Sequence, residues 1–444
     1  MTMKALDIYK LLAKKNCKEC GFPTCLAFAM KIASGKADPQ SCPYIDDETK
    51  RLLGAATRPP IRKIKIGVGE RCSTIGEEFV RFRHEKTFYN PPAILFRVPD
   101  TLDPDTIRKI ASRVERKVAT RIGQDLFVTG LAIDNASKDP DQFGKAVTVV
   151  EDAVSLPEVL TAASAEAQMR GLEQCGNYRP LLNGADASTL EQFCALAKKY
   201  GAPLSIHAKD LDELAQLTSR AVQLGVEDCV LDLSSPRLGQ FVVQSTRART
   251  LAITRERPDL GYPVLLNAAA TNDPDAAVVA GIVRYAGVII TDPLTPAKTL
   301  GALTLRQNIY TDPQKPIQVA PGLYRIGSPG EMAPVLLTVN FSLTYFTVLG
   351  YLESVGIPCF LFIVDTEGLS VLTAVAAGKL NETLVRDSIQ KFSLEGAVKH
   401  RTIILPGYAA PLSGKIQEET GWRVLVGPRD AAELGEFLEK EWKP

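Results

Sequence analysis

The stretch SIHAKDLDELAQLTSRAVQLGVEDCVLDLS, residues 205–234, contains the unit from which most of this chain is built. Two short apolar runs, SIHA at 205–208 and DCVLDLS at 228–234, enclose an amphipathic stretch at 210–224. A strand followed by a helix and a second apolar strand is typical of parallel sheets, in which the helix crosses over one face.

The same unit recurs on both sides of this stretch. Further apolar runs lie at 93–98, 126–134, 146–150, 179–185, 263–269 and 286–292, and helical stretches lie at 103–119, 155–170, 187–200, 236–254 and 273–284. The connection between the second and third runs is short and polar, so we expect one outer helix to be missing. Eight fully apolar runs alternating with helices predict a (β/α)8 TIM barrel over residues 93–315, preceded by a linker and hairpin at 59–92.

Polar residues stand at the ends of six of the predicted strands, namely Asp134, Asn183, His207, Asp232, Asn267 and Asp292. Active sites of such barrels lie at the carboxyl ends of the strands, which makes a small-molecule or pterin pocket one interpretation. The interpretation we favour is that the Asn and Asp residues cap the helices that follow. We expect His207 to be a buried histidine with satisfied hydrogen bonds rather than a base.

Charge and hydropathy narrow the functional classes. The 444 residues include 52 Lys and Arg against 51 Asp and Glu, so no overall field attracts nucleic acid or acidic lipid. The charged start MTMKALDIYK does not resemble a signal peptide, and we expect a cytoplasmic protein. The uncharged run Met332–Leu352 contains Pro334 and many hydroxyl residues, so we interpret it as a strand and a helix, with no membrane span.

Four of the nine cysteines crowd the first 42 residues, in the spacing C-x2-C-x4-C-x16-C: Cys17, Cys20, Cys25 and Cys42. Short helices at 6–14 and 26–33 flank the loop, and a module of residues 1–58 has too small a core to be stable without a metal centre. An iron–sulfur cluster fits better than zinc, because no histidine and no second paired knuckle is present. Zinc, a disulfide and an inert group of cysteines remain the alternatives. The five scattered cysteines are expected to be core residues.

Residues 325–444 predict a second, open α/β domain of Rossmann-like type. Strand-like runs at 334–340, 357–366, 400–410 and 423–428 alternate with helices, and the turn-rich PGLYRIGSPGEMAP at 321–334 is expected to be an interdomain connection. Ligands of such sheets bind at the carboxyl ends of the strands. The loops there are almost uncharged and contain no G-x-G-x-x-G, which favours a large neutral ligand over a pyrophosphate.

The order of these parts resembles the large (gamma) subunit of the corrinoid iron–sulfur protein of the acetyl-CoA pathway, over essentially the whole chain. The most specific motif is NCKECGFPTCLAFAMKIASG at 16–35. The resemblance implies a [4Fe-4S] cluster on Cys17, Cys20, Cys25 and Cys42, and cobalamin on the C-terminal domain. It also implies a carrier that takes a methyl group from methyltetrahydrofolate through a methyltransferase and delivers it to acetyl-CoA synthase. A small barrel subunit is the implied partner in a heterodimer.

The corrin contacts are expected on the strand-end loops, at Asn340, Ser342, Thr347, Gly368, Ser370, Val371, Leu372, Thr373, Gly407, Tyr408, Ala409 and Gly427. Of the motifs in cobalamin domains that supply a histidine ligand, only Ser370-Val371-Leu372 is matched here. The sole C-terminal histidine, His400, opens a strand at the wrong end. We therefore expect base-off cobalamin without a protein histidine ligand.

Two further hypotheses come from other classes. The barrel could itself be a pterin-binding methyltransferase with its own methyltetrahydrofolate site, which titration of that compound would reveal. The chain could also be a ferredoxin-like electron carrier without an organic cofactor, which its colour would reveal.

Overall fold

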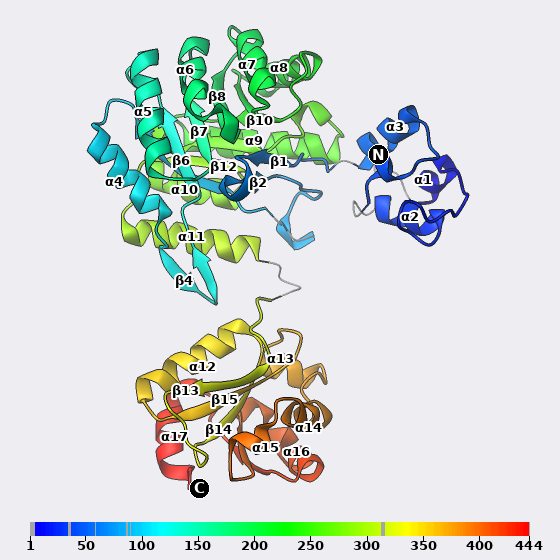
Figure 1. Cartoon of the computed structure of the whole chain (residues 1–444), viewed down its shortest axis with the longest axis vertical. Helices are drawn as coiled ribbons and strands as arrows, with labels where there is room; N and C mark the ends of the chain where they lie inside the picture. The colour runs from blue at the N-terminus through cyan, green and yellow to red at the C-terminus, as the bar shows by residue number, and fades with distance from the viewer. Residues whose placement is uncertain are drawn as a thin grey trace. The chain divides into compact units, whose positions relative to one another are not determined.

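The computed structural model describes residues 5–33, 37–57, 59–85, 88, 90–311 and 316–443. Arg58 and Lys315, at which two of the expected domain boundaries fall, lie outside the described residues. The chain divides into two compact units, residues 1–119 with 126–310 and residues 120–125 with 311–444. Figure 1 shows the ribbon in the colours of the chain order.

The N-terminal module is helical. It comprises α1 (Ala5–Leu11), α2 (Cys25–Ala33), the short 3-10 helix η1 (Pro39–Ser41) and α3 (Asp47–Thr57). Ile8, Phe28 and Ile32 form its small core together with the buried Cys25 and Cys42. So few apolar side chains contribute little stability on their own.

A hairpin follows, formed by β1 (Ile64–Ile66) and β2 (Ser73–Ile75) in antiparallel pairing. The backbone N–H of Arg62 donates to the carbonyl of Gly261, and that of Gly67 donates to the carbonyl of Arg179, both at 2.9 Å. Gly67 has a φ of +88°, and a Cβ there would lie 2.0 Å from the carbonyl oxygen of Arg71, so this turn requires glycine. The hairpin is thus bound to the loops that precede the barrel strands.

The barrel is closed and entirely parallel. Its strands, in spatial and chain order, are β3 (Ala93–Pro99), β6 (Gly130–Asp134), β7 (Glu158–Thr161), β8 (Leu181–Ala185), β9 (Leu204–His207), β10 (Cys229–Asp232), β11 (Val264–Asn267) and β12 (Val288–Thr291). The last strand pairs with the first, with Ile289 opposite Ile94. The predicted TIM barrel is therefore confirmed.

Eight helices surround these strands: α4 (Pro104–Glu115), α5 (Pro140–Ala153), α6 (Ala165–Cys175), α7 (Leu190–Tyr200), α8 (Leu211–Gln223), α9 (Leu238–Thr254), α10 (Pro274–Val283) and α11 (Pro296–Tyr310). The expected strand at 146–150 is wrong, because these residues lie inside α5, and no outer helix is missing. Asp139 caps α5 and Pro140 occupies its first turn, and these start signals outweigh the β-branched composition of Val147–Val150. The third strand is instead β7, inside a segment expected to be helical.

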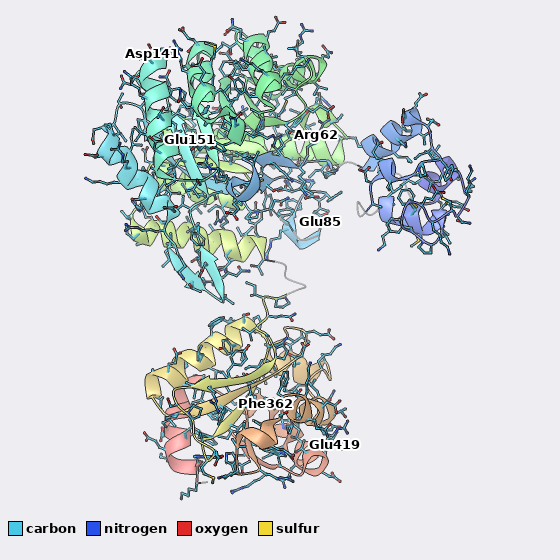
Figure 2. The ribbon with its side chains drawn as sticks, viewed as in Figure 1. Arg62, Glu85, Asp141, Glu151, Phe362 and Glu419 are labelled. Carbon is cyan, nitrogen blue, oxygen red and sulfur yellow. The ribbon has the colours of Figure 1, made fainter. Side chains whose placement is uncertain are left out.

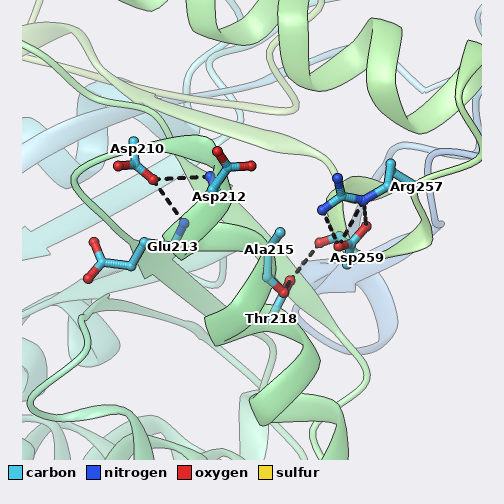
Figure 3. Close-up of polar contacts among 7 residues, drawn as sticks. All are labelled: Asp210, Asp212, Glu213, Ala215, Thr218, Arg257 and Asp259. Atoms are coloured by element: carbon cyan, nitrogen blue, oxygen red, sulfur yellow. Dashed lines mark hydrogen bonds and ion pairs between the residues drawn. The ribbon is translucent and has the colours of Figure 1, made fainter.

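The capping of these helices is illustrated by α8 (Figure 3). The carboxylate of Asp210 accepts hydrogen bonds from the backbone N–H groups of Asp212, at 3.1 Å, and Glu213, at 2.9 Å. Further along the helix, the buried hydroxyl of Thr218 donates to the carbonyl of Asp259 at 2.6 Å, and Arg257 forms an ion pair with the Asp259 carboxylate. Residues that follow a strand end by a few positions, rather than the strand ends themselves, thus begin the helices.

The second unit contains a five-stranded sheet in the order β13-β15-β14-β16-β17. Its elements are β13 (Gly322–Ile326), β14 (Val335–Val339), α12 (Ser342–Val355), β15 (Cys359–Val364), α13 (Val371–Ala376), α14 (Glu382–Lys391), α15 (Leu394–Ala397), β16 (Thr402–Leu405), η7 (Gly407–Leu412), α16 (Ser413–Thr420), β17 (Arg423–Val426), η8 (Ala431–Glu433) and α17 (Leu434–Glu441). Alternate residues of the strands face opposite cores: Leu337 and Phe362 pack on the side of α13 and α14, and Leu336 and Leu361 pack on the side of α12 and α17. The four predicted strands are present.

The stretch expected to be an interdomain connection contains a fifth strand. β13 pairs antiparallel with β15, with Tyr324 opposite Leu361. Its five residues, GLYRI, include a Gly and an Arg and have only one buried side chain, that of Ile326, so the segment lacks the apolar run by which the other strands were predicted. The uncharged run Met332–Leu352 divides into β14 and the start of α12, as expected, and among the described residues no helix is long and apolar enough to cross a membrane.

Candidate functional site

A cavity of about 530 Å³ opens at the carboxyl ends of the strands in the second unit. The chain proceeds from β14 to β15 on one side of the sheet and later returns to β16 on the other side, so the strand order reverses beside β14. In open α/β sheets this reversal separates the loops and leaves a crevice for a ligand. The cavity is lined from β14, α12, β16 and the loops after β15, β16 and β17.

Large apolar side chains stand exposed around this cavity. Leu343 and Tyr351 on α12, Leu372 on α13 and Tyr408 after β16 all line it, and Leu372 is 59% exposed. A small domain rarely leaves several such side chains together in water unless a ligand or partner covers them. The two charged side chains in the lining are Arg429 and Asp430. The site therefore suits a large ligand with a broad apolar face.

Two buried hydroxyl groups lie here without a hydrogen-bond partner among the described residues. Thr338 on β14 lines the cavity and is 2% exposed, and its Oγ1 is unpartnered. The Oγ of Ser342, at the start of α12, is likewise buried and unpartnered. Because buried hydroxyls are nearly always hydrogen-bonded, Thr338 has an unused donor and acceptor available to a ligand in the cavity.

The loop after β15 is held by one buried side chain, that of Asn340. Its Oδ1 accepts hydrogen bonds from the backbone N–H groups of Thr366 and Gly368, at 2.9 and 3.0 Å, and its Nδ2 donates to Asp365 at 2.9 Å. Gly368 has a φ of +77°, and a Cβ there would lie 2.7 Å from the side chain of Gln318. Asn340 and Gly368 thus shape the rim of the cavity rather than line it.

Six of the twelve residues predicted to contact a corrin line the cavity: Thr347, Ser370, Val371, Leu372, Tyr408 and Gly427. The other six are not part of this lining. Ala409 is part of the core, Thr373 lies with its Oγ1 2.9 Å from the Oγ of Ser370, and a Cβ on Gly407 would lie 2.8 Å from the backbone nitrogen of Arg429. Gly407 therefore permits close approach of two loops of the protein itself.

His400 is committed elsewhere in the domain. Its Nδ1 accepts from the backbone N–H of Thr402 at 3.2 Å, and its Nε2 lies 2.9 Å from the carbonyl oxygen of Ala333. Since one nitrogen accepts, the other must carry the proton and donate. The ring also packs against Trp442 at the amino ends of the strands, opposite the cavity.

The cysteine loop of the N-terminal module has an unusual backbone. Lys14, Asn16 and Lys18 adopt left-handed conformations, with φ of 56°, 49° and 67°, and Gly21 follows at 83°. Non-glycine residues rarely adopt this conformation, and several in one loop mark a segment shaped by what it encloses. The backbone N–H of Asn16 donates to the Sγ of Cys25 at 3.4 Å, a type of contact that tunes metal-bound thiolates.

The four cysteines of the N-terminal module differ in exposure. Cys17 is exposed, Cys20 is half-buried, and Cys25 and Cys42 are buried. No three of their sulfur atoms lie within 4.8 Å of one another. A tetrahedral zinc ion, with Zn–S bonds near 2.3 Å, would hold all four sulfurs about 3.8 Å apart. The donor set, four soft thiols with no histidine, fits an iron–sulfur cluster.

The polar strand ends of the barrel do not cap helices, so the interpretation we favoured for them is wrong. Arg97 on β3 pairs with Asp134 at 3.1 Å and with Asp292 at 2.8 Å. The Nδ1 of His207, whose side chain is half exposed rather than buried, lies 3.2 Å from the carbonyl oxygen of Asp232. The side-chain oxygens of two of these residues are buried and have no partner among the described residues: Asn183 and Asn267.

The sequence reasoning missed several residues of the cavity, among them Thr338, Leu343, Tyr351 and Arg429. One signal was available: the helix SLTYFTVLGYLESV carries apolar residues around most of its circumference. A helix on the outside of a small domain with no polar face indicates that something besides its own sheet covers it.

Comparison with known proteins gives the family. The chain is 40% identical to the corrinoid/iron-sulfur protein large subunit of Moorella thermoacetica over 98% of both chains. It is 37% identical to the acetyl-CoA decarbonylase/synthase complex subunit gamma of Methanopyrus kandleri over 99% of this chain and 98% of that one. The chain belongs to this family of large, or gamma, subunits.

Two family models match parts of the chain. Residues 63–438 match the model described as "CO dehydrogenase/acetyl-CoA synthase delta subunit", and residues 12–44 match one described as "Putative Fe-S cluster". The second match contains all four cysteines of the N-terminal module. Among solved structures, a dihydropteroate synthase from Coxiella burnetii in complex with pteroic acid is 14% identical, with a TM-score of 0.36, over 52% of this chain and 98% of that one.

Proposed function

We propose that this chain is the large subunit of a corrinoid iron–sulfur methyl carrier. It binds cobalamin in the cavity at the carboxyl ends of β14 and β16, and a [4Fe-4S] cluster on Cys17, Cys20, Cys25 and Cys42. When bound, the corrinoid supplies a nucleophilic cobalt that accepts and passes on a methyl group, and the cluster supplies the electron that restores this cobalt after accidental oxidation. The chain's own residues bind and position both groups.

The observation that carries the proposal is the cavity itself. Its volume of about 530 Å³ suits the nucleotide tail of a corrinoid, and the exposed Leu343, Leu372 and Tyr408 around it offer an apolar seat for a flat macrocycle. Thr338 supplies an unpartnered hydroxyl within the cavity. The names of the relatives, which contain the word corrinoid or place the subunit in a decarbonylase/synthase complex, support the same ligand.

The lower face of cobalt has no protein imidazole in this proposal. His400 is the only histidine in residues 316–443, and both of its ring nitrogens are hydrogen-bonded at the far end of the sheet. The tail would then enter the cavity and leave cobalt without a nitrogen donor from either source. Low coordination of cobalt favours its reduced, nucleophilic state. The position of His400 far from the cavity therefore suits a methyl carrier.

The partners follow from the same role. A carrier must receive a methyl group from one protein and release it to another, and here these are a methyltetrahydrofolate methyltransferase and acetyl-CoA synthase. The small barrel subunit would cover the exposed face of the corrinoid in a heterodimer. The relatives' names as subunits of complexes support this assignment.

Absorption spectra with iron and cobalt analysis of anaerobically purified protein test the function. We expect about four iron atoms and one cobalt per chain. Leu372→Glu should lose most cobalt, while Val279→Glu, at an exposed apolar position on α10, should keep it. Iron without cobalt or corrin bands would instead identify a simple electron carrier.

The barrel supports a second candidate function. The unpartnered oxygens of Asn183 and Asn267 at its carboxyl end could bind the amide edges of a pterin, which would make the chain a methyltransferase in its own right. Titration of methyltetrahydrofolate against the chain alone separates the two functions, because a pure carrier will not bind it.

A further inference from the structure

A second group of metal-binding side chains lies in the barrel, far along the sequence from the cysteines of the N-terminal module. Glu151 is in the last turn of α5, Glu158 is the first residue of β7, and Cys175 is the last residue of α6. One donor atom from each of the three lies within 4.8 Å of the others. All three positions are at the amino-terminal end of the barrel, opposite the face where such barrels hold their active sites; Figure 2 labels Glu151 on α5.

The carboxylates of this group are not satisfied. Glu158 is only 4% exposed, and neither of its oxygens has a hydrogen-bond partner among the described residues. Oε1 of Glu151 is also buried and unpartnered. Three buried carboxylate oxygens at one point require either bound protons or a cation, because bare carboxylates are too costly to bury.

One cation is already present, and its geometry leaves room for another. Arg71 donates to Oε2 of Glu151 at 2.8 Å, to the carbonyl of Val154 at 3.0 Å and to the Oγ of Ser155 at 3.1 Å, and it stacks 3.9 Å from the ring of Tyr178. Arg71 therefore binds Oε2 of Glu151 and leaves Oε1 of Glu151 and both oxygens of Glu158 without a hydrogen-bond partner among the described residues.

Charge and softness identify the kind of cation. Two carboxylates and a thiolate carry three negative charges, Arg71 neutralises one, and a divalent ion neutralises the remaining two. The carboxyl-terminal ends of α5 and α6 add their negative dipole ends to the same point, which further favours a cation. One sulfur with two carboxylate oxygens is a mixed donor set that suits zinc better than magnesium or calcium.

We propose that Glu151, Glu158 and Cys175 bind one Zn²⁺ ion with a structural role at the amino-terminal end of the barrel. The ion would join the ends of two helices and the start of a strand, and through Glu151 and Arg71 it would connect them to the hairpin segment that precedes the barrel. A water molecule would complete a tetrahedral site. Cys175 is thus a metal ligand rather than only a core residue.

The alternative is a proton in place of the ion. Burial and the neighbouring Glu151 carboxylate both raise the pKa of Glu158 well above its ordinary value. Burial, and after it the charge of the Glu158 carboxylate, raise the pKa of the Cys175 thiol. A protonated Glu158 could then donate to Glu151. This alternative needs no metal, so metal content separates it from the proposal.

The test measures zinc, iron and cobalt per chain in full-length protein purified anaerobically with zinc sulfate in the buffers. We expect one zinc per chain, and a zinc K-edge X-ray absorption spectrum with one sulfur near 2.3 Å and the other ligands oxygen near 2.0 Å. Glu158→Gln and Cys175→Ser should each lower zinc more than about tenfold while iron and cobalt stay unchanged. Cys194→Ser, which alters a buried cysteine on α7, should retain zinc.

Three outcomes would overturn the proposal. The first is protein without zinc, in which case the shared proton accounts for the buried carboxylates. The second is a zinc spectrum with several sulfur ligands, which would place the ion on the N-terminal cysteines. The third is full zinc content in a folded Glu158→Gln variant. If neither variant folds, the absorption spectrum of the parent protein alone decides the question.

Discussion

The side-chain oxygen of Asn340 accepts a 3.0 Å hydrogen bond from the backbone N–H of Gly368, and this bond joins the ends of two neighbouring strands at the rim of the cavity. Asn340 is 1% exposed, so if its side chain were removed, water could not reach the backbone N–H groups that it now accepts from. We expect Asn340→Ala to lower the free energy of unfolding by about 3 kcal/mol, because several buried donors lose their acceptor. Urea unfolding measures this loss, and bound cobalt should fall with it.

Asn381→Ala is the matched control for that variant. Asn381 caps α14 by accepting from the backbone N–H of Leu384 at 2.8 Å, and loss of such a cap costs about 1 kcal/mol. Cobalt content should stay at the parent level in this control. Equal effects of the two substitutions on cobalt would show that Asn340 has no special role at the rim.

The cluster assignment predicts separate losses of the two metals. Cys20→Ala and Cys25→Ala should each remove most iron and the reduced-cluster EPR signal, because each thiolate supplies one corner of the cluster. Cobalt should remain, since the proposed corrinoid cavity lies in the other unit. Cys229→Ala, at a buried cysteine of β10, is the control and should keep iron. Full iron in both of the first two variants would refute the assignment.

Gly407→Val should destabilise the chain even without cobalamin. A Cβ at this position would meet the backbone of Pro428 and Arg429, each at 2.8 Å, so the two loops would have to separate. We expect a loss of about 1 to 3 kcal/mol, typical of overpacking, in thermal unfolding of corrinoid-free protein. A variant as stable as the parent that still excludes cobalamin would instead show that the corrin ring itself needs this space.

His400→Ala should leave cobalt unaffected. The ring forms hydrogen bonds with the backbone of Ala333 and Thr402 at the amino ends of the strands. Its loss should lower the free energy of unfolding by about 1 to 2 kcal/mol and leave cobalamin binding unchanged. The Co(II) EPR spectrum of the parent should lack nitrogen superhyperfine splitting, and the variant should give the same spectrum. A nitrogen triplet that disappears in His400→Ala would contradict the proposed lower face.

Two carboxylates of the barrel predict opposite dependences on pH. Burial raises the pKa of Asp232 above its ordinary value, so its contribution to stability is fully present at low pH and is lost as the pH rises through the raised value. Asp232→Asn should therefore gain stability relative to the parent as the pH rises from about 3 to 8, as measured by urea unfolding.

Asp186 provides the opposite sign. Hydrogen bonds from Ser188 and Thr189 lower the pKa of Asp186, so its contribution is present at neutral pH and is lost as the pH falls through the lowered value. Asp186→Asn should lose stability relative to the parent at neutral pH, and the difference should shrink in acid. If the stability difference from the parent changed with pH in the same direction for both variants, the opposite pKa shifts of Asp232 and Asp186 would be contradicted.

The sequence predicted the domains of this chain better than the individual strands within them, and each wrong strand assignment has an identifiable cause. Seven of the eight barrel strands follow from apolar composition, but Val147–Val150 is β-branched within a helix whose start is set by Asp139 and Pro140. Local start signals and packing on the barrel outweigh residue propensity there. The strand β13 is mostly half-buried and contains Gly322 and Arg325, so it lacks an apolar run and is recognised only by its pairing with β15.

At the candidate site, the sequence located the strand-end loops but not the cavity wall. Ser370, Leu372 and Tyr408 follow the carboxyl ends of strands within a few residues, and composition and strand order locate those ends. Thr338 lies within a strand, and the side of the sheet that it faces depends on register and on the reversal of strand order, which only the assembled sheet defines. Glu158 and Cys175 are 17 positions apart and meet only because helix α6 returns to the same end of the barrel.

The pairing of β12 with β3 affects how the protein can be made. Ile94 and Ile289 face each other across the seam, so a growing chain has synthesised nearly all of the barrel before its first strand finds its second neighbour. Until then β3 presents an open edge, the kind of surface that associates with other unfinished chains or recruits chaperones. A ribosome that stalls before Val288 should therefore release an aggregation-prone fragment, whereas one that stalls just after Tyr310 should release a closed barrel.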